Sequence, residues 1–312
     1  SLGSAPTATV AGSPYTINVN NVGGGTADLN NYVVTYNTGV MTVNQAALLL
    51  ITALDQSKTY GDTFTFNGTE FTPSGLLNGD TVTSATLASL GAANTANSGT
   101  YNIDVSNAVG TGLGNYNISY TSGIMTVNKA LLTATADDKS MTYGGTFPTL
   151  TASYTGFVNG ENSGVIDTLA ALASATAATA DAGVYTDTLT ASSAADNNYD
   201  FQYVAGDLTI NKAGLLVTAD DQTKTYGDTF TFAGTEFTTG GLVNGDTVTS
   251  ATLASLGAVN TASVAGSTYD IDISNAAGLI NLNNYNVTYQ KGAMTVNPAA
   301  LSVTADNQTK TY

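Results

Sequence analysis

The sequence predicts an all-β chain made of a tandem array of small sandwich-like domains. Three observations predict it: a set of motifs that recurs at a fixed spacing, segments in which apolar and polar residues alternate, and many Gly, Asn and Asp residues between those segments. Period-two alternation is typical of a strand buried on one face, and turn residues between such segments favour β-domains. We expect an immunoglobulin-like arrangement, with a β-grasp-like one as the alternative.

The repeat is visible in three short motifs that recur in step. Thr-Tyr-Gly occurs around Tyr60, Tyr143 and Tyr226 at spacings of 83 and 83 residues, and Tyr312 follows 86 residues later. An Asn-Tyr pair and a closing segment, which is Met-Thr-Val-Asn at 125–128, recur with it. Self-similarity at a fixed period is the signature of a repeat array.

These motifs divide the chain into five segments. We predict the C-terminal part of a repeat (1–46), three full repeats (47–129, 130–212 and 213–298, the second of them divergent) and the opening strand of a further repeat (299–312). Closing and opening strands follow each other almost directly, so we expect no flexible linker and an elongated, semi-rigid rod. Both ends of the sequence fall inside a repeat, and we therefore expect a longer parent array.

Each full repeat is expected to open on a half-buried strand, whose inward residues in the first repeat are Leu49, Ile51 and Ala53. Asn67-Gly68 then predicts a two-residue hairpin turn that pairs Phe64 with Phe71 across the strands. Near the end of the repeat, Tyr116 and Tyr120 alternate with polar residues. We expect these tyrosines in the core rather than in a ligand platform.

The composition excludes several classes of function. Seven lysines stand against 23 Asp and Glu, the formal net charge is −16, and the chain has no Arg, His, Cys or Trp. Such a surface would repel nucleic acids and anionic membranes, so we expect no nucleic-acid partner. Without imidazole or thiol groups, the usual zinc and copper sites and the histidine and cysteine catalysts are excluded. No apolar segment approaches the roughly 18 residues of a membrane span, so we expect no membrane insertion.

The ordered motifs closely resemble the MBG ("mostly beta, glycine-rich") repeat family over essentially all 312 residues. In the first repeat the resemblance rests on residues 58–62, 75–82, 99–101, 115–120 and 125–130. The middle repeat departs from it, because Tyr143-Gly144-Gly145 lacks the Asp and Glu161 replaces Asp in Asn-Gly-Asp. Because the middle repeat still keeps the frame, we expect the acidic residue at these two points not to be chemically essential. The resemblance implies a repetitive role in very large bacterial exoproteins, including filamentous-haemagglutinin-like adhesins, on the cell surface or secreted, with no catalytic residues.

Carboxylates are the only candidate chemistry. Calcium needs six to eight oxygen ligands, and loops could contribute some of them through Asp62, Asp228, Asp137-Asp138 and Asp220-Asp221. We favour the interpretation that these residues set turns, and calcium stays an alternative. We predict no catalytic, cofactor-binding or metal-binding residue and no enzymatic activity, because an active site is singular whereas these features are repeated.

The remaining charged residues are expected at the surface. Glu70 and Glu236 are counterparts in two repeats, so we interpret them as solvated strand positions rather than as the facing pair of a glycoside hydrolase. Lys58, Lys139 and Lys224 flank a turn, where solvation is expected. Neither group predicts a reactive site.

The leading functional hypothesis is a stalk or spacer that projects a binding region located elsewhere in a large bacterial adhesin. The alternative is a self-assembling extracellular filament or biofilm-matrix protein, and a third hypothesis has the repeats themselves bind polysaccharide. The expected partners are accordingly neighbouring repeats of the same chain, copies of the chain, or extracellular polysaccharide.

Overall fold

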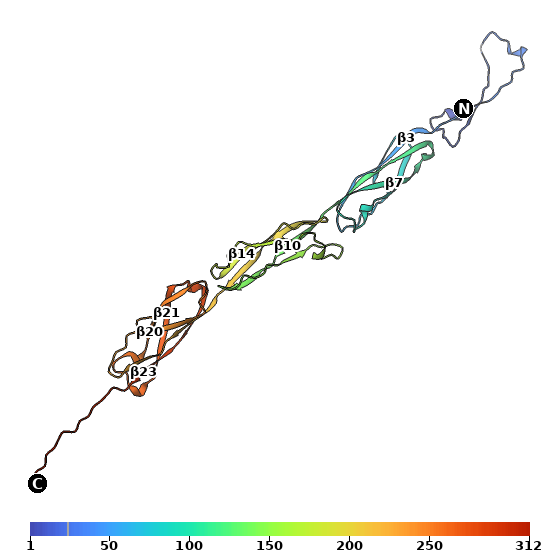
Figure 1. The fold of residues 1–312 in the computed structure, drawn as a ribbon. Coiled ribbons are helices and arrows are strands. Elements are labelled where there is room, and N and C mark those ends of the chain that lie inside the picture. Colours follow the sequence, from blue (N-terminus) through green and yellow to red (C-terminus); the bar gives the residue numbers. More distant parts are fainter. Residues whose placement is uncertain (24) are drawn as a thin grey trace. The chain divides into compact units, whose positions relative to one another are not determined.

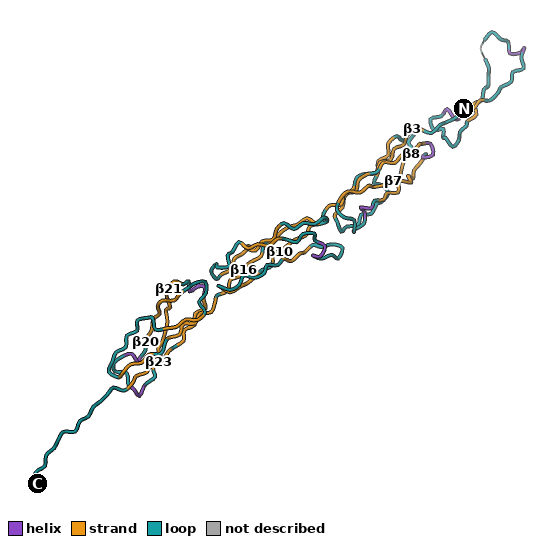
Figure 2. Tube along the Cα trace, viewed as in Figure 1, coloured by secondary structure: helices purple, strands orange, loops and turns teal. Residues whose placement is uncertain are grey.

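The computed structural model describes residues 1–23 and 25–312, and strands dominate its regular structure (Figure 1). Helical elements in these ranges are 3₁₀ turns of three residues, drawn purple in Figure 2. The prediction of an all-β chain of tandem β-domains is confirmed. The chain forms two compact units, made of residues 1–133, 154–169 and 194–202, and of residues 134–153, 170–193 and 203–312.

The first repeat contains a three-stranded sheet centred on its opening strand, β3 (Ala46–Ala53). β5 (Phe71–Ser74) pairs with β3 in the antiparallel direction, and β8 (Tyr116–Thr121) pairs on its other side in parallel. Leu49 and Ile51 of β3 are fully buried, as the alternation in the sequence predicts. The central strand of this sheet therefore supplies one side of the core.

A four-stranded sheet of order β4-β9-β7-β6 supplies the other side of the core. Its strands are β4 (Gln56–Thr59), β6 (Thr81–Ala88), β7 (Gly99–Thr111) and β9 (Gly123–Asn128). Its buried side chains include Ile103, Val105, Met125 and Val127. Because β3 contacts both β7 and β9, the two sheets face each other as a sandwich.

Two parallel strand pairs distinguish this sandwich from an immunoglobulin domain, whose sheets are antiparallel. β3 runs parallel to β8 in one sheet, and β4 runs parallel to β9 in the other. The opening segment β3–β4 and the closing segment β8–β9 therefore pass from sheet to sheet side by side. At the crossing, the Asp55 carboxylate accepts a hydrogen bond of 2.7 Å from the backbone N–H of Ile124.

The third repeat has the same two sheets, ordered β19-β17-β22 and β18-β23-β21-β20. Its strands are β17 (Ala213–Ala219), β18 (Gln222–Thr225), β19 (Phe237–Gly240), β20 (Thr247–Ala254), β21 (Tyr269–Leu279), β22 (Tyr285–Gln290) and β23 (Gly292–Asn297). The fully buried side chains Leu215, Ile271 and Met294 come from both sheets, as in the first repeat.

The middle repeat keeps this strand order despite its divergent sequence, with sheets β12-β10-β15 and β11-β16-β14-β13. Its strands are β10 (Ala130–Ala136), β11 (Lys139–Thr142), β12 (Ala152–Thr155), β13 (Ala171–Ser174), β14 (Gly183–Ser192), β15 (Tyr199–Val204) and β16 (Gly206–Asn211). Leu132, Leu189 and Leu208 are its most deeply buried leucines.

The predicted hairpin at Asn67-Gly68 is wrong. Residues 63–70 form a loop, and Phe71 pairs with Ala53 of β3 instead of with Phe64. A type I′ hairpin turn needs positive φ at both central residues, but here only Gly68 has it, at +85°. The chain closes instead around a side-chain carboxylate.

That carboxylate belongs to Glu70, which the sequence suggested was a solvated strand position. It accepts hydrogen bonds of 2.9–3.0 Å from the backbone N–H groups of Asn67, Gly68 and Thr69. Burial raises the pKa of Glu70, but the backbone hydrogen bonds outweigh it and hold the pKa below its usual value. Glu236 closes the equivalent loop of the third repeat in the same way, so both glutamates are structural anchors.

The two outer segments carry little regular structure. β1 (Tyr15–Ile17) and β2 (Gly39–Met41) form a two-stranded antiparallel sheet. Residues 298–312 have no regular secondary structure, and Leu301 and Val303 are exposed. A strand is ordered by its partners, and in the full repeats the strands that flank β3 or β17 come later in the sequence.

Candidate functional site: the contacts at the repeat junctions

The junctions are built around the Thr-Tyr-Gly motif, which forms a corner at the end of the second strand of each repeat. In the first repeat β4 ends at Thr59, and the backbone N–H of Tyr60 then donates a hydrogen bond of 2.8 Å to the carbonyl oxygen of Asn128. Gly61 follows with φ of +92°, a left-handed conformation that favours glycine. The corner therefore directs the Tyr60 side chain out of its own repeat.

A buried lysine holds this corner from inside. Lys58 is only 7% exposed, and its Nζ donates to the carbonyl oxygens of Asp62 and Ala93 at 2.9 and 2.7 Å. Lys224 is buried to the same extent and bonds the equivalent carbonyls of Asp228 and Val259.

The expectation that these lysines are solvated is thus wrong for both, because backbone carbonyls replace water around the ammonium group. Burial lowers the pKa of Lys58, and the nearby Asp62 carboxylate partly offsets that effect. Lys139 of the middle repeat is more exposed and donates instead to the Thr151 hydroxyl.

The Tyr60 side chain meets a carboxylate and a second tyrosine from the middle repeat. Its hydroxyl donates to Glu161 Oε1 at 2.6 Å, and the Tyr199 hydroxyl donates to Glu161 Oε2 at 2.6 Å. The two rings pack edge to face, with centroids 5.6 Å apart and planes at 85°. We call Tyr60, Glu161 and Tyr199 the first clasp, and its tyrosines are 5% and 1% exposed.

The second clasp joins the middle repeat to the third through Tyr143, Asp246 and Tyr285. Both hydroxyls donate to the same oxygen, Asp246 Oδ2, at 3.2 and 2.6 Å. The ring centroids are again 5.6 Å apart, with planes at 81°. Asp246 and Glu161 perform the same task with side chains of different length, so the carboxylate at this position has a structural role that the sequence did not predict.

The environment of the clasps raises the pKa of three of their phenols, those of Tyr60, Tyr199 and Tyr285. Burial, reinforced by the hydrogen bond to the carboxylate, raises the pKa of Tyr199 and that of Tyr285 to about 12. The pKa of Tyr60 is raised for the same two reasons. At neutral pH these hydroxyls are therefore hydrogen-bond donors to the carboxylate.

The Asn of the Asn-Tyr motif makes a second contact at each junction. Its side-chain oxygen accepts a hydrogen bond from a backbone N–H of the preceding segment, and Asn284 does so while only 1% exposed. The three pairs are Asn115 with Val10, Asn198 with Ser98, and Asn284 with Ala182, at 3.0, 2.9 and 2.8 Å.

The glycine of the corner allows the close approach of the next repeat. A Cβ on Gly61 would lie 2.5 Å from Val158 Cβ, and a Cβ on Gly144 would lie 2.4 Å from Val243 Cβ. Gly227 has nearly the same φ as Gly61, but no described atom lies within 4 Å of the position of its Cβ. Glycine is therefore required at 61 and 144 by packing as well as by backbone conformation.

The corner tyrosine is buried where a further repeat packs against it and is exposed where none does. Tyr60 and Tyr143 are 5% and 6% exposed, whereas Tyr226 is 50% exposed. Because the three tyrosines occupy the same place in their own repeats, the clasp and not the corner decides their burial.

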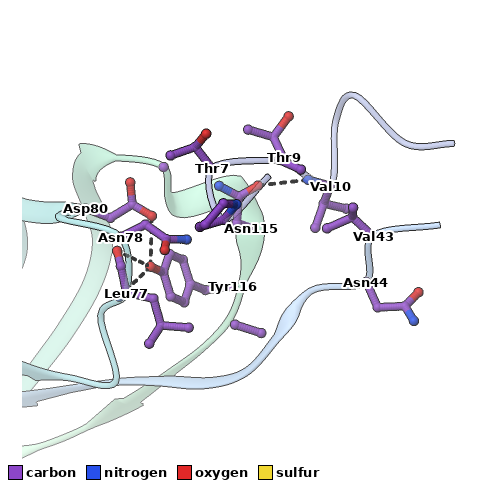
Figure 3. A pocket seen from close by; sticks show the side chains of 14 residues that line it. Thr7, Thr9, Val10, Val43, Asn44, Leu77, Asn78, Asp80, Asn115 and Tyr116 are labelled. Carbon is purple, nitrogen blue, oxygen red and sulfur yellow. Dashed lines mark hydrogen bonds between the residues drawn. The ribbon is translucent and has the colours of Figure 1, made fainter. Parts of the chain in front are cut away.

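A third tyrosine–carboxylate pair, Tyr116 and Asp80, lines a cavity of about 390 Å³. Figure 3 shows the residues around this cavity. The Tyr116 hydroxyl donates to Asp80 Oδ2 at 2.8 Å and accepts from the backbone N–H of Leu77 at 2.8 Å. The walls opposite are residues 6–10 and 43–44. We call this space the Tyr116 cavity.

Three of the acidic residues considered as calcium ligands, Asp137, Asp138 and Asp221, accept hydrogen bonds from segments distant in the sequence. Asp138 and Asp221 each accept a backbone N–H, from Asp207 and Ala293, at 2.7 Å. Asp137 accepts hydrogen bonds from neighbouring hydroxyls, which holds its pKa below the usual value. In residues 1–23 and 25–312 no group of three or more Asp, Glu, His or Cys side chains could hold a metal ion.

The sequence predicted which tyrosine of each Asn-Tyr motif is buried, but it did not reveal the clasps. Tyr116, Tyr199 and Tyr285 are buried as expected, whereas Tyr120 remains 39% exposed. What sequence reasoning missed is that the Tyr-Gly, Asn-Tyr and Asn-Gly-Asp motifs of successive repeats meet at one place. The signal was present, since all three motifs recur in step.

Comparison with known proteins agrees with the tandem organisation. The family model described as MBG domain (YGX type) matches residues 49–126, 132–209 and 215–295. No curated protein matches the chain. Within the described ranges no helix has the length and apolar character needed to cross a membrane. The chain therefore belongs to the MBG domain family, whose members are structural repeats found in large surface proteins and are not a known enzyme family.

Proposed function

We propose that the three repeats are a structural spacer in a large bacterial adhesin, secreted or on the cell surface, and that they project a binding region located elsewhere in the parent protein. The observation that carries the proposal is the presence of a tyrosine clasp at both junctions between full repeats. A spacer has to hold the binding region at a distance from the cell, so the junctions between its repeats must resist bending.

The clasp is suited to this task because it combines interactions of different kinds. A hydrogen bond to a charged group contributes about 1.5–3 kcal/mol, and an edge-to-face aromatic pair about 0.5–1.5 kcal/mol. Each clasp has two such hydrogen bonds and one such pair, and the Asn contact adds a further hydrogen bond. Bending at a junction would have to break several of these interactions together.

The repetitive composition supports the same role. A net charge of −16 on 312 residues keeps copies apart in solution, and carboxylates used to hold loops and junctions leave little reactive chemistry. For the polysaccharide-binding alternative, Tyr116, Tyr199 and Tyr285 offer no platform, since they are buried in the repeats and junctions, whereas the recurrent Tyr120, Tyr203 and Tyr289 are 37–39% exposed.

Small-angle X-ray scattering of the whole chain tests the proposal. Three domains in line, with strands of roughly 8–10 residues at about 3.3 Å per residue plus loops, give an expected maximum dimension above about 100 Å. Opening both clasps by Tyr60→Ala and Tyr143→Ala should shorten the mean dimension and broaden its distribution, whereas Tyr226→Ala is the matched control and should not. A compact wild-type profile, or identical profiles for all variants, would contradict the spacer function.

A further inference from the structure

The first and last segments of each full repeat lie side by side and run in the same direction. In the first repeat, Ala46 of β3 lies opposite Tyr116 of β8, and at the other end Thr59 of β4 lies opposite Asn128 of β9. The other full repeats share this pairing, with β11 parallel to β16, β17 to β22, and β18 to β23. We call the paired segments, residues 46–59 and 116–128 in the first repeat, the parallel ladder.

A carboxylate continues the parallel ladder where it passes from one sheet to the other. Asp55 stands between β3 and β4, and its side chain accepts a hydrogen bond of 2.7 Å from the backbone N–H of Ile124 in β9. The same contact recurs in the other full repeats, also at 2.7 Å, and joins Asp138 to Asp207 and Asp221 to Ala293. The two segments are therefore bonded in both sheets and at the crossing between them.

Glycine permits the close approach of the two segments at this crossing. A Cβ on Gly123, which begins β9, would lie 2.7 Å from the carbonyl oxygen of Ala53 at the end of β3. Gly206 and Gly292 begin the equivalent strands of the other repeats, and a Cβ on either would also meet the opposite backbone. Each full repeat thus has the same aspartate and the same glycine where its first and last segments cross.

The chain enters and leaves each repeat at opposite ends of the parallel ladder. It enters the first repeat at Ala46 and leaves it after Asn128, and only Lys129 separates Asn128 from Ala130, where β10 begins. The next passage is equally short, because a single residue lies between β16 and β17. A pull along the chain therefore acts along the parallel ladder, and not across it.

We propose that the repeats bear tension along the chain and that the parallel ladder is the element that resists it. Because the pull acts along the paired strands, their hydrogen bonds are loaded in shear and must break together. A single backbone hydrogen bond contributes little net free energy, so the resistance depends on this simultaneous loading. Residues 60–115, which include β5, β6 and β7, carry no load until the ladder breaks.

The positions of the strands within the sheets also oppose sliding. β3 lies between β5 and β8 in its sheet, and β9 lies between β4 and β7 in the other, so each segment has one strand held on both sides. Leu49 and Ile51 of β3 and Met125 and Val127 of β9 are buried in the core. Shearing the ladder would therefore remove apolar side chains from the core as well as break hydrogen bonds.

Bearing tension goes beyond the spacer function, which requires junctions that resist bending. The parallel ladder lies within a repeat, whereas the clasps join successive repeats. A chain with weak clasps could still resist tension, and a chain with weak ladders could still hold its junctions straight. The two functions are therefore tested separately, the spacer by scattering and the ladder by force.

Single-molecule force measurement on the whole chain tests the proposal by pulling the first repeat in two directions. The chain has no Cys, so two introduced cysteines define the attachment points. Gln45→Cys with Lys129→Cys loads the ladder in shear. Gln45→Cys with Gly114→Cys pulls apart the adjacent starts of β3 and β8 and peels the ladder from one end. All three positions are exposed, and a Cβ on Gly114 meets no atom within 4 Å.

We expect the shear direction to need a several-fold higher force than the peeling direction at the same pulling rate. In shear the repeat should lengthen in one step of about 230–260 Å, which is the extended length of residues 45–129 at about 3.3–3.6 Å each, less about 45 Å for the folded ladder. Equal forces in the two directions, or lengthening in several small steps in shear, would overturn the proposal.

A pair of aspartate variants tests the crossing within the ladder. Asp55→Ala removes the contact with Ile124 and should lower the force in the shear direction. Asp104→Ala is the matched control, because Asp104 lies on β7 outside the ladder and accepts a hydrogen bond from the Ser122 hydroxyl at 3.1 Å. An unchanged length of the step shows that each variant was folded before it was pulled. An unchanged force in Asp55→Ala, or equal losses in both variants, would overturn the continuity of the ladder across the crossing.

Discussion

Removing one hydroxyl from the first clasp is the sharpest test of how the repeats are joined. Tyr60→Phe deletes the 2.6 Å hydrogen bond to Glu161 Oε1 and keeps the ring that packs on Tyr199. The substitution therefore separates the hydrogen bond from the aromatic packing. Tyr226→Phe makes the same chemical change at the same place in a repeat, where the side chain is half exposed.

The expected magnitude follows from the geometry. A hydrogen bond to a charged group contributes about 1.5–3 kcal/mol, and the lower part of that range applies because Glu161 keeps its bond to Tyr199. A loss of about 1.5–2 kcal/mol raises the population of the opened junction roughly 10- to 30-fold. For Tyr226→Phe we expect less than about a twofold change, as for most surface substitutions.

Amide hydrogen exchange on the whole chain measures this change locally, so it does not require that the three repeats unfold as one unit. The reporter is the backbone N–H of Ser98, which crosses the junction to Asn198 at 2.9 Å. Its exchange rate should rise by the predicted factor in Tyr60→Phe and stay constant in Tyr226→Phe. An unchanged rate in Tyr60→Phe, or an equal increase in both variants, would refute the assignment of the clasp as the element that holds the junction.

Three further predictions concern the glycine, the phenols and the core tyrosine. Gly144→Ala and Gly227→Ala should each lose about 1 kcal/mol of stability, because alanine disfavours the positive φ at both positions. Only Gly144→Ala should lose a further 1–3 kcal/mol, roughly, because its Cβ would clash with Val243 of the next repeat. The difference in melting temperature between the two variants measures the cost of the clash. Tyr199 and Tyr285 have folded-state pKa values of about 12 against an ordinary 10.0, so their stabilising contribution is complete below pH 10 and is lost as the pH rises through 12. Urea unfolding between pH 9 and pH 12, followed by far-UV circular dichroism, should show this decline, and a flat profile would contradict it. Tyr116→Ala should destabilise the first repeat by about 3–5 kcal/mol in the same assay, and an unchanged midpoint would show that this ring contributes no packing.

The sequence by itself determined the fold class, the repeat and the inward faces of the strands. Period-two alternation identifies Leu49 and Ile51 as core residues because a strand turns successive side chains to opposite faces, whatever strand it later pairs with. The absence of His, Cys and Arg likewise limits the chemistry in any fold. The recurrence of tyrosine at the same place in each repeat showed that these positions matter structurally.

Only the tertiary structure decided how the strands pair and where the charged side chains lie. Asn67-Gly68 has the composition of a hairpin turn, but the Glu70 carboxylate closes the loop around it and β5 pairs with β3. Local propensity does not contain these contacts. Lys58 is buried because two carbonyl oxygens far apart in the sequence converge on it.

The clasps depend on tertiary structure for the same reason. Glu161 is separated by 101 residues from Tyr60 and by 38 from Tyr199, so no local pattern relates the three. Tyr60 and Tyr226 stand in the same sequence motif, yet one is buried and the other half exposed. Their own repeats are alike, and the difference arises from whether a following repeat supplies a carboxylate and a second ring.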